Sequence, residues 1–185
     1  IIEHVEREAP TYGAINLEDI RAPRCFKAEE ALKDKLDIPV FHDDQHGTAI
    51  VVLAALKNAL EIAEKDLSEV RIAISGAGAS GIAVANFLIE AGAQEIVPVD
   101  SSGILRTDDE NEYKADLAKR TQASEEQGDL SDAMKDADVF IGLSAPGIVS
   151  KEMVGSMADD SIVFALANPE PEILPEDARE AGAFI

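Results

Sequence analysis

Apolar residues along the chain recur in two spacings, which predict helices and strands in alternation. Repeats of three or four residues are typical of helices, and short apolar runs bounded by turn residues are typical of buried strands. The predicted helices are residues 1–8, 23–36, 48–64, 82–91, 113–120, 130–135, 151–157 and 175–181. The predicted strands are residues 14–17, 40–41, 70–75, 95–99, 139–143 and 162–166. Strands separated by helices favour right-handed crossovers and therefore a parallel sheet.

Two of these segments have unusual compositions. The helix over residues 48–64 is mostly apolar, which predicts burial on more than one side. Pro98 falls inside a predicted strand, and central strands disfavour proline. We keep the strand because the apolar pattern around Pro98 is otherwise regular.

A glycine-rich turn joins the predicted strand over residues 70–75 to the following helix. Residues 76–81 read Gly-Ala-Gly-Ala-Ser-Gly, and Asp100 ends the next predicted strand. Gly76 permits the tight turn, Gly78 lets the backbone approach a pyrophosphate, and Gly81 lets helix and strand pack closely. The helix N-terminus attracts phosphate, and an acid at position 100 can bind an adenosine ribose. We therefore predict a Rossmann-like, doubly wound parallel sheet that binds NAD or NADP.

The choice between NAD and NADP is open. Asp100 should repel a 2′-phosphate and so favours NAD slightly. Ser101 and Ser102 could donate hydrogen bonds to that phosphate, and Arg106 lies close enough in sequence to reach it.

The composition allows a packed core and narrows the partners. Of the 185 residues 46% are hydrophobic, while 37 acids against 16 bases give a net charge of −21. This charge repels nucleic acid and anionic membranes. It fits an ordinary acidic cytoplasmic protein, or one from a high-salt cytoplasm, which we favour. Acids cluster at residues 108–110 and 125–126.

No segment predicts a membrane span or a disulfide. The longest apolar run, residues 49–56, is far shorter than the ~20 residues that a span needs. Cys25 is the single cysteine, and we expect its side chain to be buried and to pack in the core. The chain opens on Ile1 and ends on an apolar stretch, so we expect a piece of a longer protein.

Pairs of acids follow two predicted strands. Glu18-Asp19 and Asp43-Asp44 stand where parallel sheets bind ligands, and His42 and His46 flank the second pair. Carboxylate oxygens suit Mg²⁺ or Mn²⁺, whereas zinc would need a cysteine and histidine cluster. Spacing alone does not separate such a site from an acidic surface.

Six segments together resemble malic enzymes, in particular the shorter prokaryotic type. They are NLEDI at 16–20, APRCF at 22–26, HDDQHGTA at 42–49, GAGASG at 76–81, FIGLSAPG at 140–147 and FALANP at 164–169. The family decarboxylates L-malate oxidatively to pyruvate and CO₂ with NAD or NADP and a divalent cation. The resemblance covers nearly the whole chain.

The resemblance assigns roles to individual residues. It implies metal binding by Glu18, Asp19 and Asp44, and positioning of the catalytic base by Asp43. The cofactor positions it implies, together with the glycine turn, are Thr48, Gly76, Ala77, Gly78, Ala79, Ser80, Gly81, Asp100, Ser144, Ala145 and Asn168. Asn168 would also contact the substrate.

The family's catalytic lysine and tyrosine have no match here, since Tyr12, Lys27 and Lys57 stand in other contexts. We expect both residues upstream, and the chain alone to have little or no activity. Residues 1–42 would then be the end of the substrate and metal domain, a remnant of a second α/β domain. Residues 43–185 would be the dinucleotide domain of a cytoplasmic homodimer or larger homo-oligomer.

Two alternatives remain at this point. One is another dinucleotide enzyme of the amino-acid dehydrogenase type, which would not need the acid pairs. The other is a non-catalytic nucleotide-binding module.

Overall fold

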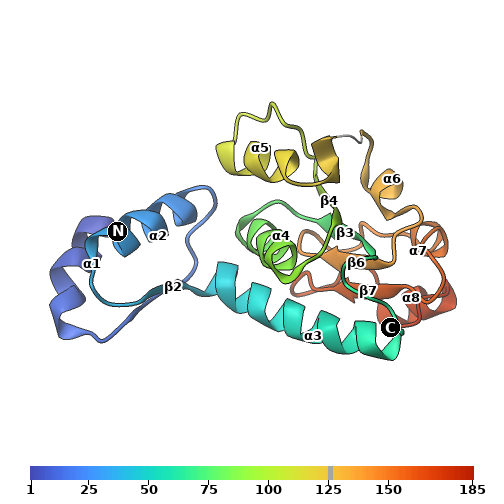
Figure 1. Cartoon of the computed structure of the whole chain (residues 1–185), viewed down its shortest axis with the longest axis horizontal. Coiled ribbons are helices and arrows are strands. Elements are labelled where there is room, and N and C mark those ends of the chain that lie inside the picture. Colours follow the sequence, from blue (N-terminus) through green and yellow to red (C-terminus); the bar gives the residue numbers. More distant parts are fainter. Residues whose placement is uncertain (125–126) are drawn as a thin grey trace.

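Five strands form the main sheet of the computed structural model, which describes residues 1–124 and 127–185. They are β3 (Arg71–Ser75), β4 (Glu95–Asp100), β5 (Gly103–Ile104), β6 (Val139–Gly142) and β7 (Ile162–Ala165). Their order across the sheet is β5-β4-β3-β6-β7, and β4, β3, β6 and β7 are parallel (Figure 1). The predicted α/β fold with a Rossmann-like parallel sheet is confirmed.

The edge strand β5 differs from the prediction because it is antiparallel to β4. It pairs only two residues, Gly103 and Ile104, so no periodicity in the sequence could reveal it. Pro98 does lie inside β4, opposite Ile74 of β3. The missing N–H of Pro98 is tolerated because β5 reaches only Val99 and Asp100, while the Pro98 carbonyl accepts from Leu105 N–H at 3.0 Å.

Helices pack around this sheet at the predicted places (Figure 1). They are α3 (Thr48–Ile62), α4 (Ala79–Ala91), α5 (Glu112–Lys119), α6 (Leu130–Met134), α7 (Lys151–Gly155) and α8 (Pro175–Glu180). Helix α4 begins three residues before the predicted start, because Gly78 is its N-cap and the glycine turn runs straight into it. The prediction that the helix over residues 48–64 is buried on more than one side is wrong. Helix α3 buries a single stripe, formed by Ala49, Val52, Leu56, Ala59 and Leu60, and keeps Ile50, Val51 and Ile62 exposed.

The N-terminal residues form a small lobe beside the main sheet (Figure 1). It contains α1 (Ile2–Glu8), β1 (Ile15–Leu17), α2 (Arg24–Lys35) and β2 (Val40–His42), with β1 and β2 parallel. Leu17, Leu32 and Val40 form its own small core. Cys25 and Phe26 of α2 are buried in the main core instead, as expected for Cys25. Helix α2 therefore joins the two lobes.

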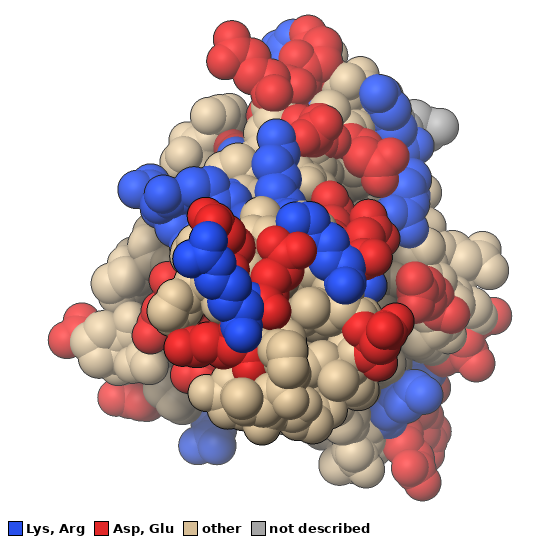
Figure 2. Space-filling view, turned by 90° about the vertical axis from the view of Figure 1, so that its left-hand side faces the viewer, with Lys and Arg blue, Asp and Glu red and all other residues tan. Residues whose placement is uncertain are grey.

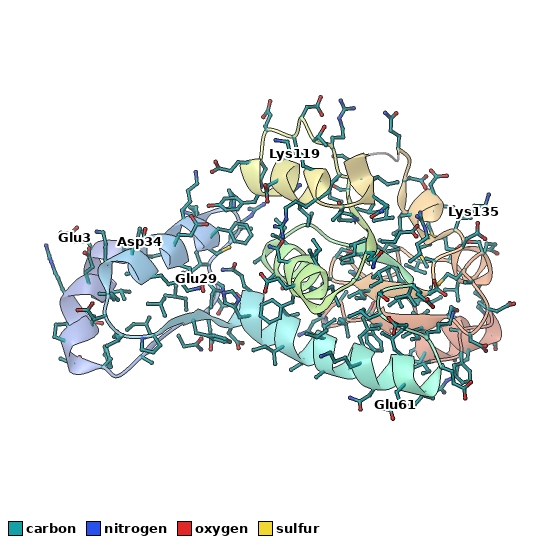
Figure 3. The ribbon with its side chains drawn as sticks, in the orientation of Figure 1. Glu3, Glu29, Asp34, Glu61, Lys119 and Lys135 are labelled. Carbon is teal, nitrogen blue, oxygen red and sulfur yellow. The ribbon has the colours of Figure 1, made fainter. Side chains whose placement is uncertain are left out.

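The buried side chain of Glu29 also joins the lobes, at the start of α3 (Figure 3). Its Oε1 lies 2.7 Å from His46 Nε2 and 2.7 Å from Lys33 Nζ, and Gln45 Nε2 donates to its Oε2 at 3.2 Å. His46 and Gln45 belong to one π-helical turn, Asp43–Gly47, that leads from β2 into α3. A buried carboxylate with several partners fixes this turn against α2.

The surface of the small lobe carries both signs of charge in spite of the net charge of the chain. Figure 2 shows blue and red side chains side by side on this face. Ion pairs form within and between α1 and α2, and one of them joins Lys35 to Glu6 at 2.9 Å. The acidic residues 125–126 lie outside the described part of the chain. Within the described part, no helix has the length and apolarity to cross a bilayer.

Candidate functional site

A cleft of about 1080 Å³ opens at the carboxyl ends of β3, β4 and β6. Its walls come from the glycine turn, the loop after β4, the loop after β6 and the segment before α2. The lining residues include Arg21, Ser75, Gly76, Ala77, Gly78, Ala79, Asp100, Ser101, Ser102, Lys114, Ser144, Ala145 and Ile148. In parallel α/β sheets this edge, where the strand order reverses, is the place for ligands.

The three glycines of the turn differ in what surrounds them. Gly76 has φ +107°, and a Cβ there would lie 2.5 Å from the carbonyl oxygen of Leu143. A Cβ on Gly81 would lie 1.7 Å from the carbonyl oxygen of Gly76, so the start of α4 packs directly on the turn. At Gly78 a Cβ would meet nothing within 4 Å. The turn therefore leaves an open place at Gly78, which a phosphate group can fill.

The N-terminus of helix α4 makes the open space beside Gly78 electropositive. The helix starts at Ala79 with Gly78 as N-cap, and no side chain caps it among the described residues. The first N–H groups of a helix have no partner within the helix and carry a partial positive charge. An anion beside Gly78 would meet these groups without a bulky side chain in between.

Asp100 ends β4 at one side of the cleft, and both of its carboxylate oxygens already have partners. Lys114 Nζ of α5 forms an ion pair with Oδ2. The backbone N–H of Ser102 donates to Oδ1 at 2.7 Å. Asp100 is thus held in place, and Lys114 offsets much of its charge.

Ser144 and Ala145 follow β6 and line the other side of the cleft. The hydroxyl groups of Ser144 and Ser75 share a hydrogen bond of 2.8 Å, which ties the β6 loop to the end of β3. The backbone N–H of Ser144 donates to Glu172 Oε1 at 2.9 Å. Sequence reasoning missed both partners, because Ser75 and Glu172 are distant from Ser144 along the chain.

Four of the predicted cofactor residues do not line the cleft: Thr48, Ser80, Gly81 and Asn168. The hydroxyl of Ser80 donates instead to the carbonyl oxygen of Asp44 at 2.8 Å. Arg106 also lies outside the cleft lining and makes two hydrogen bonds of 2.9 Å to Asp108.

Two cations in the cleft were not predicted. Lys114 lies on α5, well beyond the strand that carries Asp100, and no motif marks it. Arg21 follows the Glu18-Asp19 pair and lines the same cleft from the small lobe. In the part of the chain that the structure describes, Arg21 forms no ion pair, so it is available to an anionic ligand.

The predicted metal ligands are only partly brought together. Asp19 and Asp44 are neighbours, since the backbone N–H of Asp19 donates to Asp44 Oδ2 at 3.0 Å. Glu18 Oε1 instead accepts from Asn16 Nδ2 at 2.7 Å. Among the described residues, no three His, Cys, Asp or Glu side chains converge into a metal site. The arrangement therefore does not fit a three-carboxylate metal site.

Asp43 and His42 lie beside this pair without joining it. Asp43 is exposed, and its carboxylate lies over the backbone of Gly47, where a Cβ would come within 2.4 Å of Oδ1. His42 is fully buried, and neither ring nitrogen has a hydrogen-bond partner among the described residues.

Helices α2 and α5 meet on the side of the cleft that Asp100 and Lys114 line. The rings of Phe26 and Tyr113 lie 4.4 Å apart between centroids, and the Tyr113 hydroxyl donates to Glu30 Oε2 at 3.2 Å. Burial, and then the negative charge of Glu30, raise the pKa of Tyr113 to about 12. Burial likewise raises the pKa of the Cys25 thiol. Neither group is poised for acid–base chemistry near neutral pH.

Comparison with known proteins relates this chain to one family. The family model for the NAD-binding domain of malic enzyme matches residues 45–182. An NAD-dependent malic enzyme of Geobacillus stearothermophilus is 53% identical over 97% of this chain and 38% of its own length. An NADP-dependent malic enzyme of Halomonas elongata is 49% identical over 97% of this chain and 42% of its own length.

A solved structure agrees with these matches. The crystal structure of an NAD-dependent malic enzyme from Thermotoga maritima superposes with a TM-score of 0.96. It is 46% identical, and the alignment covers 100% of this chain and 50% of that one. The chain thus spans less than half the length of the curated relatives named here.

Proposed function

Since this chain belongs to the malic enzyme family, we propose that it supplies the dinucleotide-binding part of an enzyme that converts L-malate to pyruvate and CO₂ while reducing NAD or NADP. The observation that carries the proposal is the cleft with its open place at Gly78. The glycine turn and the start of α4 suit a pyrophosphate there.

The two lobes take different parts in this proposal. Residues 43–185 bind the dinucleotide, and residues 1–42 contribute to the substrate domain. The separate small core of Leu17, Leu32 and Val40 supports such a division. The burial of Phe26 in the main core means that α2 holds the two parts together.

The bound dinucleotide would supply the hydride acceptor for malate oxidation. The backbone at Gly78 and the start of α4 would hold its pyrophosphate. Asp100 would accept hydrogen bonds from the adenosine ribose, while Ser144 and Ala145 would contact the nicotinamide half. Arg21 would add positive charge from the opposite wall.

The charges around Asp100 leave the choice between NAD and NADP open. A bare Asp100 carboxylate would repel a 2′-phosphate, which is why the sequence favours NAD slightly. The ion pair with Lys114 reduces that repulsion, so the preference for NAD loses most of its support.

The divalent cation stays a prediction from the family resemblance. Glu18, Asp19 and Asp44 would have to rearrange to bind Mg²⁺ or Mn²⁺ together, because Glu18 pairs with Asn16 and Asp44 with the N–H of Asp19. The homo-oligomer, the cytoplasmic location and the adaptation to high salt also stay predictions.

A titration with NADH tests the proposed function. The chain should bind NADH saturably, and Gly78→Asp should abolish binding. The new side chain meets no atoms within 4 Å but brings a negative charge to the place of the pyrophosphate. Gly13→Asp is the matched control, because Gly13 also has nothing within 4 Å of a Cβ and lies outside the cleft. Equal NADH affinity in the Gly78→Asp variant and the unaltered chain would refute the site.

A further inference from the structure

Glu172 is a fully buried acid outside the predicted machinery of this chain. It lies on the loop between β7 and α8, and it does not line the cleft. Across the described residues no cation pairs with it. A buried carboxylate is retained only when hydrogen bonds replace its hydration, so the partners of Glu172 indicate its purpose.

These partners are backbone N–H groups from the loops after two neighbouring strands. Oε1 accepts from the N–H of Ser144, after β6, at 2.9 Å. Oε2 accepts from the N–H of Ala167, after β7, at 3.0 Å. One carboxylate thus spans the two strand ends, and each oxygen fixes one loop.

The surrounding backbone is shaped to accept this carboxylate. A Cβ on Gly142, the last residue of β6, would lie 2.4 Å from Glu172 Cδ, so any side chain there would take the place of the acid. The same loops are joined by Gly147 N–H to the Pro171 carbonyl at 3.0 Å, and by Val149 N–H to the Glu172 carbonyl at 3.1 Å. Glu172 is therefore at the centre of a set of hydrogen bonds that join the β6 and β7 loops beside the cleft.

These hydrogen bonds hold the wall of one half of the cleft only. Ser144 and Ala145 form the β6 wall, across the sheet from Asp100 on β4. If the pyrophosphate lies at the glycine turn between these strands, the adenosine lies toward β4 and the nicotinamide toward β6. The Ser144 N–H that binds Glu172 sets the direction in which the β6 loop leaves the sheet.

We infer that Glu172 is a positioning residue that holds the β6 and β7 loops in the shape required by the nicotinamide half of the dinucleotide. The inference rests on the proposed function, because it assumes that the cleft binds a dinucleotide. Glu172 itself does not touch the ligand and acts only through Ser144 and Ala167.

Calorimetric titration of the full chain with two probes tests this role. NADH occupies both halves of the cleft, whereas ADP carries only the adenosine and the pyrophosphate. Glu172→Gln keeps the shape of the side chain but turns an amide NH₂ toward one of the two N–H donors. We expect the dissociation constant for NADH to rise about tenfold and that for ADP to change less than about twofold. Glu170→Gln is the matched control, since Glu170 is exposed on the same loop, and it should leave both constants unchanged.

Each other outcome overturns the inference in a distinct way. Unchanged NADH binding in Glu172→Gln would refute the positioning role. An equal loss of affinity for both probes would show that Glu172 supports the fold in general and not the nicotinamide half. If the unaltered chain binds neither probe, the proposed function fails and the inference with it. Glu172→Asp, which is one methylene too short to span both N–H groups, gives a second variant with the same expected split.

Hydrogen exchange on the unaltered chain gives a test that needs no variant. Ser144 is exposed, so its amide should exchange fast unless Glu172 holds it. Strong protection of the Ser144 amide is expected, and exchange at the rate of an open loop would contradict the clamp.

Discussion

Lys114 changes the interpretation of Asp100 more than any other side chain in the cleft. An acid at the end of the second strand of such a sheet is expected to bind ribose hydroxyls and to repel a 2′-phosphate. Here the lysine pairs with it, and Ser102 N–H binds the other oxygen. Under the proposed function, the cleft therefore presents nearly balanced charge where the two dinucleotides differ.

Replacing Lys114 should separate the two cofactors. In Lys114→Gln the Asp100 carboxylate loses its cation, so we expect NADPH binding to weaken about tenfold and NADH binding about twofold or less. Fluorescence titrations with each nucleotide measure both constants. Lys119→Gln on the exposed face of α5 is the charge-matched control (Figure 3). Equal weakening for NADH and NADPH would show that Lys114 acts on the common part of the ligand.

Tyr113 should make the chain less stable as the pH rises above about 10. Its pKa is about 12 in the folded chain against an ordinary value of 10.0, so between these values the folded state holds a proton that the unfolded state has lost. The free energy of unfolding should therefore fall as the pH rises from 10 to 12, and Tyr113→Phe should lessen this fall.

Urea midpoints across that pH range measure the effect. The chain has two tyrosines and no tryptophan, so in Tyr12→Phe the absorbance of tyrosinate reports Tyr113 alone. Ionisation of Tyr113 near pH 10 in that variant would contradict its burial between α2 and α5.

Strand β3 and helix α4 approach each other more closely than any side chain at Gly81 would permit. The backbone of Gly76 lies where a Cβ of Gly81 would stand, whereas Gly78 faces open space. The first contact builds the fold, and the second leaves room for a ligand. The same short motif thus packs tightly at one glycine and leaves open space at another.

Alanine substitutions should separate these two uses. Gly81→Ala should lower the free energy of unfolding by about 3 kcal/mol or more, because a methyl group would overlap backbone. Gly78→Ala should change it by about 0.5 kcal/mol or less. Chemical denaturation of both variants measures the difference. Equal losses would mean that the turn is not packed against α4 in the way described.

The net charge of −21 acts on the chain as a whole. Local ion pairs such as Lys35 with Glu6 use a few of the acids, but most of the excess remains unpaired by any base. Mutual repulsion of these charges opposes folding, and salt screens it over about 10 Å at 0.1 M.

Salt should therefore stabilise this chain if its acidity is an adaptation to high salt. We expect the urea midpoint to rise steadily with KCl up to molar concentrations. An uncharged osmolyte at equal osmotic strength is the control, since it does not screen charge. A midpoint that is the same in low and high KCl would rule the adaptation out.

The order of helices and strands, the parallel sheet and the glycine turn were all readable from the sequence. Each depends on neighbours within a few residues: apolar spacing, turn residues, and glycines between a strand and a helix. The short motifs were also enough to recognise the family. The family match leaves the alternative of an amino-acid dehydrogenase relative without support. The edge strand β5 escaped prediction because two residues carry no period.

The partners of the site residues depended on folding. Segments that are separate along the chain meet where Lys114 pairs with Asp100 and where Glu172 binds Ser144 and Ala167. The same is true of Arg21, which lines the cleft together with the glycine turn. The same holds for Glu18, which pairs with Asn16 instead of joining Asp19 and Asp44. The local sequence pattern identifies candidate site residues, because helix and strand propensity and apolar periodicity are local properties. Which of them meet is set by how the strands order and pack, and that depends on contacts across the whole sheet.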